Sequence, residues 1–410
     1  MVKQSPILGG FLLRPCPGHD ITKAMKKYDV IIIGAGAAGL AAAAMTTARG
    51  RRTAILDMGP HPARKVRVSG GGRCNITNMA AGRDRYFGNN PDFVRGAIAR
   101  VTPTDILEWA RRHQLHPAET DPGRYFCDAG AAAVVDALIH DAAGADIYYD
   151  TPVTSVTSTD SGFIVQTTHG PYGAARLIVA TGGVSYPNLG VSDIGYRVAK
   201  QFGHRVCPPR PGLVAMNTKM FSSQLAGISM PVDIRIGRAV VSDAILMTHN
   251  GIGGPAAYRA SLYDLTDGIQ IDFCPGIDIA EFIRSARLQN GRRTLAGILG
   301  TQIPVKMAKW LAGDTGPKNI ADMTRDDIAA VATRVNRFAI PHDAISRAPL
   351  TGAEVTFGGV DTRDISSKTM ESKLTPGLFF VGEVLDVTGD LGGFNLHWAW
   401  ASGRIAGQSV

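Results

Sequence analysis

A chain of 410 residues with 45% hydrophobic and 19% charged residues has the composition of a globular protein of two or three domains, which excludes a fibrous or disordered chain. Its net charge of +8 is of the sign that attracts nucleic acid or an anionic membrane. The basic residues are scattered as short pairs, such as Arg51-Arg52 and Arg292-Arg293, so we expect neither partner. Five dispersed cysteines without a CxxC motif argue against a local redox dithiol or zinc site and are typical of a reduced cytoplasmic protein.

Residues 1–24 differ in character from the rest of the chain. They contain Pro6, Pro15 and Pro17 and an apolar patch at 7–13 that is short for a signal peptide. A buried strand begins soon afterwards, and Met25 followed by two lysines resembles a natural start. We therefore predict that 1–24 form a disordered extension.

Residues 28–57 have the order strand, glycine turn, helix, strand and acid. The apolar run at 30–33 is typical of a central parallel strand, and an alanine-rich helix and a second strand at 53–56 follow. Gly34 permits the tight turn, Gly36 lets a pyrophosphate approach the backbone, and Gly39 lets the helix lie close to the strand. The helix N-terminus offers N–H groups to phosphates, and Asp57 stands where an acid accepts hydrogen bonds from an adenosine ribose. The pattern predicts a dinucleotide site.

Two other interpretations suit the apolar character of this stretch. One is a buried glycine-rich turn without a ligand, and the other is a transmembrane helix, because the run is nearly long enough to span a bilayer. The three glycines at fingerprint positions and the polar Thr46, Thr47 and Arg49 argue against a span.

A second glycine-rich segment lies at 62–78. Gly70, Gly71 and Gly72 are consecutive, which excludes a regular helix or strand there and predicts a loop whose N–H groups face an anion or a flat ring. A flexible surface loop is the alternative. The polar residues around the glycines favour a cofactor loop; they are Arg64, Lys65, Arg67, Arg73, Asn75 and Asn78.

Helices are predicted at 91–99, 103–113, 131–143 and 193–202, and the first two open on proline. Strands are predicted at 146–149, 152–157, 163–168 and 175–180. In the short strand within 121–128, Arg124, Tyr125 and Cys127 could reach a ligand, but we favour a packing role. The last strand runs into small residues that let the chain turn beside a bound dinucleotide; they are Ala180, Thr181, Gly182 and Gly183.

Prolines within 207–211 indicate a domain boundary, and strand-like segments follow to about 273. Residues 244–261 form a strand, glycine turn and helix without a third glycine or a downstream acid, so we favour a structural turn over a second nucleotide site. Residues 279–336 are predicted to be a charged helical insert. Near the C-terminus a buried strand at 377–382 leads into a polar glycine-rich loop and a helix, which presents N–H groups to a carbonyl or a developing negative charge.

Five segments in this order resemble the YhiN/BaiN-type FAD flavoproteins, known as NAD(P)/FAD-dependent oxidoreductases or aminoacetone-oxidase-like enzymes. The resemblance covers 28–405, and its SGGGRCNITN and GGFNLHWAW motifs are specific to that family. The five segments are GAGAAG at 34–39, RKVRVSGGGRCNITN at 64–78, ATGGVSYPNLG at 180–190, GGVDTRDISSKTMES at 358–372 and VGEVLDVTGDLGGFNLHWAWASG at 381–403.

The resemblance implies an α/β protein with a Rossmann-like FAD-binding domain of glutathione-reductase type at 25–205 and 350–410. It implies an inserted β-barrel-like domain at 206–278 and 340–349, which carries a helical subdomain at 279–339. By motif, the residues implied to bind FAD are Gly34, Gly36, Ala37, Ala38, Gly39, Asp57, Met58, Arg64, Lys65, Gly70, Gly71, Gly72, Arg73, Cys74, Asn75, Val153, Ala180, Thr181, Gly182, Gly183, Gly382, Glu383, Asp386, Gly392, Gly393, Phe394 and Asn395.

The resemblance supplies no catalytic acid or base, and no metal site is predicted. His397, where many relatives carry Gln, is one candidate for contact with the substrate, and Tyr186 and His249 are the others. We predict a cytoplasmic FAD-dependent oxidoreductase of a small molecule, with no nucleic-acid or membrane partner. NAD(P)H would reduce the flavin by hydride transfer, and a small organic acceptor or O2 would reoxidise it. Because a second complete GxGxxG is absent, NAD(P)H would bind transiently.

Two alternative functions stay open. One is an FAD-dependent oxidase of a small amine such as aminoacetone. A more distant one is a flavin-dependent protein that acts on tRNA or binds nucleic acid, which the sequence pI near 9.3 motivates and the lack of basic tracts disfavours.

Overall fold

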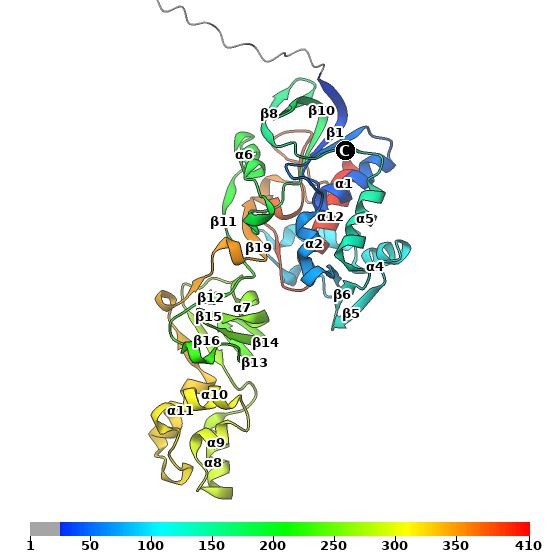
Figure 1. Cartoon of the computed structure of the whole chain (residues 1–410). Helices are drawn as coiled ribbons and strands as arrows, with labels where there is room; N and C mark the ends of the chain where they lie inside the picture. Colours follow the sequence, from blue (N-terminus) through cyan, green and yellow to red (C-terminus); the bar gives the residue numbers. More distant parts are fainter. Residues whose placement is uncertain (1–24) are drawn as a thin grey trace, which may run out of the picture.

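The computed structural model describes residues 25–410 (Figure 1), so the predicted extension at 1–24 lies outside the described residues. A seven-stranded sheet forms the centre of the first part of the molecule, in the order β7-β2-β1-β10-β9-β8, with β20 also paired to β10. The pairs β1–β2, β1–β10, β2–β7 and β10–β20 are parallel. The strands are β1 (Lys26–Ile33), β2 (Thr53–Leu56), β7 (Asp146–Tyr148), β8 (Val153–Thr159), β9 (Gly162–Thr167), β10 (Gly170–Val179) and β20 (Leu378–Phe380).

The predicted apolar run at 30–33 occupies the middle of this sheet. Val30, Ile31, Ile32 and Ile33 are each at most 3% exposed, as expected for a strand with neighbours on both edges and helices on its face. Helix α1 (Ala37–Ala48) follows it directly, and the predicted strand at 53–56 has the predicted bounds.

Helices from both ends of the chain pack side by side over this sheet. Figure 1 shows α1 in blue next to α12 (Phe394–Ser409) in red. Glycines make the close approach possible: a Cβ on Gly403 would lie 2.3 Å from the carbonyl oxygen of Ala38, and one on Gly407 would lie 2.4 Å from that of Ala42. The C-terminal segment is therefore built into the N-terminal dinucleotide fold.

The predicted glycine loop is one part of the segment at 62–78, and regular elements flank it. Arg64–Val68 forms a short helix, α2, and Asn75–Asn78 forms strand β3, which pairs with β6 (Arg124–Cys127). Ser69–Gly72 forms an irregular 3-10 turn with Gly70 and Gly71 in the left-handed region, and residues 73–74 connect it to β3 without regular structure. The strand could not be inferred locally, because its partner lies about fifty residues away along the chain.

The remaining elements of this part include the four predicted helices, whose bounds differ from the predicted ones by at most four residues, and three short strands that were not predicted. They are β4 (Tyr86–Phe87), α3 (Arg95–Arg100), α4 (Pro103–Arg112), β5 (Pro117–Asp121), α5 (Gly130–Asp141) and α6 (Ile194–Gln201), with β21 (Thr388–Gly389) paired to β4.

An antiparallel pair of strands, β11 (Val206–Gly212) and β19 (Val355–Val360), lies between the first part and the rest of the molecule (Figure 1). The proline-rich segment at 207–211 belongs to β11. Beyond it, a second sheet runs in the order β17-β16-β13-β14-β15-β12-β18. Its elements are β12 (Met216–Asn217), β13 (Ser229–Ile236), β14 (Ala239–Thr248), β15 (Gly251–Gly253), α7 (Gly254–Ala260), β16 (Ile269–Asp272), β17 (Phe338–Ile340) and β18 (Ser346–Arg347).

Four helices form the far end of the molecule, opposite the first sheet (Figure 1). They are α8 (Ile279–Asn290), α9 (Leu295–Leu299), α10 (Val305–Ala312) and α11 (Arg325–Asn336). Their apolar side chains share one buried cluster with the second sheet, whereas the first sheet and its helices have a separate cluster. The two cores lie on either side of the β11–β19 pair. The exact domain boundaries given from the sequence remain a prediction. Between residues 25 and 410, no helix is long and apolar enough to cross a membrane.

Candidate functional site

A cavity of about 700 Å³ lies at the carboxyl edge of the first sheet. Its lining residues directly follow four parallel strands: Gly34 follows β1, Asp57 follows β2, Ala180 follows β10, and Gly382 lies just after β20. This edge is where open α/β sheets bind their ligands. The volume is in the upper part of the range for small-molecule pockets, which suits a large ligand.

The three fingerprint glycines have three different surroundings. Gly34 has a φ of +108°, and a Cβ there would lie 2.5 Å from the carbonyl oxygen of Ala180. A Cβ on Gly39 would lie 1.9 Å from the carbonyl oxygen of Gly34, so this glycine permits packing of α1 and does not line the cavity. A Cβ on Gly36 would meet no atom of residues 25–410 within 4 Å, and Gly36 lines the cavity at the N-terminus of α1.

Asp57 ties the end of β2 to the glycine turn. Its Oδ2 accepts a hydrogen bond from the backbone N–H of Ala35 at 2.7 Å, and its Oδ1 accepts one from that of Gly59 at 2.8 Å. The Arg64 guanidinium lies 3.6 Å from Oδ1. Each carboxylate oxygen has two lone pairs, so both can accept a further hydrogen bond from a ligand hydroxyl.

An ion pair joins distant segments on another part of the wall. Lys65 Nζ donates to both carboxylate oxygens of Glu383 at 2.8 Å and to Ser185 Oγ at 2.7 Å. Glu383 Oε1 also accepts a hydrogen bond from the backbone N–H of Thr356 at 2.7 Å. This network links α2, the turn after β10, the segment after β20, and β19.

Tyr186 brings a protonated phenol to the cavity. Its hydroxyl donates to Glu354 Oε2 at 2.7 Å, and Lys65 Nζ lies 5.7 Å from the centroid of its ring. Burial, and then the neighbouring Glu354 carboxylate, raise the pKa of the Tyr186 hydroxyl above its ordinary value. The hydroxyl therefore keeps its proton at neutral pH.

Two glycine-rich segments about 300 residues apart meet at the far side of the cavity. Gly70, Gly71 and Asn75 line it from the first, and Gly392 and Gly393 line it from the second. A Cβ on Gly393 would lie 2.6 Å from Asn75 Oδ1, so the two loops are in close contact. Asn395 holds the second loop: its Oδ1 accepts from Gly389 N at 2.8 Å, and its Nδ2 donates to Gly389 O at 2.9 Å.

These features fit FAD. The open side of Gly36 at a helix N-terminus suits the pyrophosphate, the free lone pairs of Asp57 suit a ribose, and the cavity continues to two glycine-rich loops against which a flat ring can lie. The predicted cofactor residues that line the cavity are Gly34, Gly36, Ala37, Ala38, Asp57, Met58, Arg64, Lys65, Gly70, Gly71, Asn75, Val153, Ala180, Thr181, Gly182, Gly183, Gly382, Glu383, Gly392, Gly393 and Asn395.

Six predicted cofactor residues are not part of the lining. Asp386 is buried, and its Oδ2 accepts from the backbone N–H of Asn89 at 2.9 Å. The Arg73 guanidinium lies 4.6 Å from the centroid of the Phe126 ring, and burial raises the pKa of the Cys74 thiol to about 12. The six residues are Gly39, Gly72, Arg73, Cys74, Asp386 and Phe394. The motif places all six near the cofactor in sequence, but in the fold none of them lines the cavity.

Two of the three catalytic candidates also lie away from the cavity. His397 is 0% exposed, with Nδ1 2.8 Å from Thr77 Oγ1, and desolvation lowers its pKa to about 4. His249 is exposed in the turn between β14 and β15. The lining therefore includes Tyr186 but neither histidine.

Other lining residues come from segments without a binding motif. Arg124 and Phe126 are on β6, which was expected to pack, and Leu213, Glu354 and Val355 lie at or beside the β11–β19 pair. Their side chains reach the cavity because of strand pairing between distant segments, which no local pattern reveals. Of the three residues of β6 that the sequence named as able to reach a ligand, Arg124 lines the cavity, and Tyr125 and Cys127 do not.

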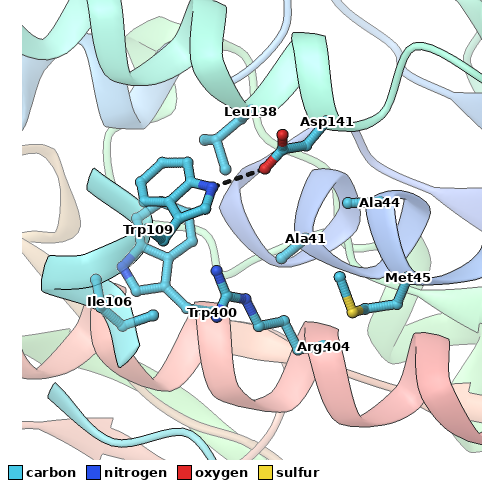
Figure 2. Close-up of a pocket in the computed structure, with 9 residues that line it drawn as sticks. All are labelled: Ala41, Ala44, Met45, Ile106, Trp109, Leu138, Asp141, Trp400 and Arg404. Carbon is cyan, nitrogen blue, oxygen red and sulfur yellow. Dashed lines mark hydrogen bonds between the residues drawn. The ribbon is translucent and has the colours of Figure 1, made fainter. Parts of the chain in front are cut away.

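A second cavity of about 20 Å³ lies between α1, α4, α5 and α12 (Figure 2). Trp109 Nε1 donates to Asp141 Oδ2 at 2.7 Å on its wall, and Arg404 lies nearby. This volume holds about one water molecule, and none of its lining residues is shared with the large cavity in the described chain. We interpret it as a structural gap in helix packing.

Comparison with known proteins decides the family. The model of the HI0933-like protein Rossmann domain matches residues 28–409. The chain belongs to this family. It is an α/β FAD-dependent oxidoreductase, as the YhiN/BaiN-type resemblance predicted.

Three curated relatives cover nearly the whole chain. The chain is 36% identical over 397 residues to the "Ribosomal RNA dihydrouridine synthase" of Escherichia coli (strain K12), covering 94% of this chain and 98% of the relative. It is 38% identical over 401 residues to the protein of the same name from Haemophilus influenzae, covering 94% and 99%. It is 27% identical over 411 residues to the "3-dehydro-bile acid delta(4,6)-reductase" of Clostridium scindens, covering 92% and 98%.

Proposed function

We propose that this protein is an FAD-dependent reductase of an activated carbon–carbon double bond, and that its substrate is a uridine in RNA. The observation that carries the proposal is the 36–38% identity, over almost the full length, to two relatives named for dihydrouridine synthesis in ribosomal RNA. The more distant alternative from the sequence was a flavin-dependent protein that acts on tRNA or binds nucleic acid, and the scattered basic pairs disfavoured it. These relatives make a nucleic-acid substrate the first candidate, with ribosomal RNA in place of tRNA.

The names of the relatives share one kind of chemistry. Dihydrouridine is uridine with two hydrogen atoms added across a double bond that is conjugated to a ring carbonyl. In a 3-dehydro bile acid with double bonds at positions 4 and 6, those double bonds are also conjugated to a carbonyl. Reduction of the uridine double bond needs a hydride at the carbon remote from the carbonyl and a proton at the carbon next to it.

The residues of the cavity can divide these tasks. Bound FAD would supply the hydride. Tyr186 would supply the proton, because its raised pKa keeps the phenol protonated until a strongly basic carbon of the substrate lies against it. Glu354 orients the Tyr186 hydroxyl and is itself exposed, so solvent can restore the proton.

Electrons would come from NAD(P)H, which would bind transiently at the same cavity. A second GxGxxG motif is absent from the sequence, so the nicotinamide nucleotide has no Rossmann site of its own. An RNA substrate and this donor would both be met in the cytoplasm, which is the location we propose.

The test is a reaction of purified, FAD-loaded protein with NADH or NADPH and an in vitro transcribed ribosomal RNA fragment. After nuclease digestion, mass spectrometry should find a nucleoside heavier than uridine by two hydrogen atoms. Tyr186→Phe should retain bleaching of the flavin spectrum by the nicotinamide donor and lose most of the product. Unmodified uridine in every RNA offered, including total ribosomal RNA, would contradict the proposal.

Two other outcomes distinguish the other candidates. If a small cyclic enone restores the flavin spectrum and RNA does not, the substrate is a small molecule, as the name of the bile-acid relative suggests. If a small amine such as aminoacetone bleaches the flavin and the nicotinamide donors do not, the protein is an amine oxidase.

A further inference from the structure

The helical end of the molecule carries most of the net positive charge. Residues 279–339 contain ten Lys and Arg and five Asp and Glu, a net charge of +5, whereas the whole chain has +8. No long basic run marks this segment, because its charges are spaced along four helices and their connections. The net positive charge of the chain is therefore concentrated in one part of the fold, although its basic residues are spread over the whole sequence.

Several of these basic side chains are not neutralised within the fold. Arg284 pairs with Glu281, and Lys318 pairs with Asp327. Six other basic residues of this segment are exposed, and no carboxylate in the part of the chain that the structure describes lies within ion-pair distance of them. They are Arg292, Arg293, Lys306, Lys309, Arg325 and Arg337.

The unpaired basic residues come from parts of the subdomain that the fold brings together. Arg292 and Arg293 lie in the turn between α8 and α9, and this turn bonds to the 316–320 segment through Ile320 N and Arg293 O at 3.0 Å. Lys306 and Lys309 are three residues apart on α10 and share one face, and α10 packs on α9 and α11. Exposed acids are also present, namely Asp314, Asp322 and Asp326, and the balance stays positive.

The position of this subdomain separates it from the chemistry. It lies at the opposite end of the molecule from the first sheet (Figure 1), and the cavity lining contains no residue between 214 and 353. Its charges therefore do not serve FAD or a small substrate inside the cavity. A ligand that contacts both these charges and the cavity must extend well beyond the cavity.

We propose that residues 279–339 form a docking surface for the phosphate backbone of RNA, which holds a structured RNA while one of its uridines enters the cavity. This inference rests on the proposed function. Exposed Lys and Arg side chains without carboxylate partners are the groups that release counterions when they meet phosphates. An RNA substrate is also long enough to contact both ends of the molecule.

A membrane is a weaker match for the same charge. A helix that lies in a bilayer interface needs a continuous apolar face beside its basic one. The large apolar side chains exposed here are Leu288 on α8 and Val305 on α10, one on each helix. Binding to phosphate groups without apolar insertion is what this surface supports.

The test compares two variants of the full-length, FAD-loaded protein, each with four exposed basic residues replaced by Gln. The surface variant changes Arg292, Arg293, Lys306 and Lys309. The matched control changes exposed basic residues of the first part, outside the cavity lining and without an ion pair within residues 25–410; they are Arg51, Arg111, Lys200 and Lys368. Both variants should melt at the wild-type temperature, and NAD(P)H should bleach their flavin absorbance at the wild-type rate.

The probe is a fluorescently labelled ribosomal RNA fragment, with affinity measured at several salt concentrations. Each phosphate contact contributes roughly 0.7–0.9 to the slope of log K against log salt, so loss of four contacts should reduce that slope by about three. The control variant should keep the wild-type slope and affinity. Equal slopes for both variants, or a loss confined to binding of anionic lipid vesicles, would overturn the proposal.

Product formation separates this inference from the proposed function. If dihydrouridine forms on RNA with the same KM in both variants, the docking surface is wrong and the function stands. If RNA binding depends on the surface residues but neither protein forms dihydrouridine, the surface stands and the function is wrong.

Discussion

Replacement of Gly36 by Val tests the cofactor site without disturbing the fold. A Cβ at this position meets no atom of residues 25–410 within 4 Å, and Gly36 has a φ of −80° and a ψ of −174°, which a β-branched residue adopts readily. The protein without cofactor should therefore fold with wild-type stability. The added side chain projects into the cavity at the N-terminus of α1, where the pyrophosphate would lie.

The expected loss follows from the contacts that the valine would block. Two hydrogen bonds from first-turn N–H groups to phosphate oxygens are charge-assisted and contribute about 1.5–3 kcal/mol each. Their loss amounts to roughly 3–6 kcal/mol, or about two to four orders of magnitude in the FAD dissociation constant. The matched control is Gly39→Ala, where the new Cβ would lie 1.9 Å from the carbonyl oxygen of Gly34 and should destabilise the fold itself.

The assay is titration of cofactor-free protein with FAD, followed by flavin fluorescence, with thermal melting of the same samples. The Gly36→Val protein should melt at the same temperature as the cofactor-free wild type and should bind FAD far more weakly. Gly39→Ala should melt at a lower temperature even without FAD. A Gly36→Val protein that binds FAD with wild-type affinity would refute the placement of the pyrophosphate.

Three further variants test other parts of the site. Asp57→Ala should weaken FAD binding and also lower the melting temperature without FAD. The N–H groups of Ala35 and Gly59 each lose a hydrogen-bond acceptor, which costs about 1–3 kcal/mol of folding stability for each group. Unchanged titration and melting curves would reject the assignment. Tyr186→Phe should slow substrate reduction roughly 10²- to 10⁴-fold and leave bleaching by NAD(P)H unchanged in stopped-flow spectra, whereas equal loss in both steps would point to a structural role. His397 has a pKa of about 4 in the folded protein, so it stays neutral there, whereas in the unfolded chain it takes up a proton below about pH 6.5. The free energy of unfolding should therefore fall as the pH drops from 6.5 toward 4, by about 2 kcal/mol at pH 5. His397→Gln should lose that part of the pH dependence in urea unfolding at pH 7 and pH 5, and an identical dependence would show that the histidine is protonated in the fold.

Much of the cavity wall could be predicted from local sequence. The roles of Gly34, Gly36 and Asp57 depend on backbone conformation and on the order of neighbouring elements, which short motifs encode directly. The excess of positive charge in 279–339 could also have been counted from the sequence, and a search for basic runs overlooked it.

Other features depended on contacts between distant segments. His397 belongs to a specific motif but points into the core toward Thr77, because α12 packs against the first part of the chain. Glu354 and Leu213 reach the cavity through the pairing of β11 with β19, and Tyr186 meets Glu354 across 168 residues of sequence.

The sequence by itself determined the Rossmann-like fold, the glycine turn and the acid that follows the second strand, since these follow from local backbone chemistry and from the apolar period of each element. Only the tertiary structure decided which motif residues face the cavity, which tyrosine is paired with a carboxylate, and which basic residues are left without one. These properties depend on side-chain direction and on pairing between residues far apart in the chain, and a linear pattern records neither.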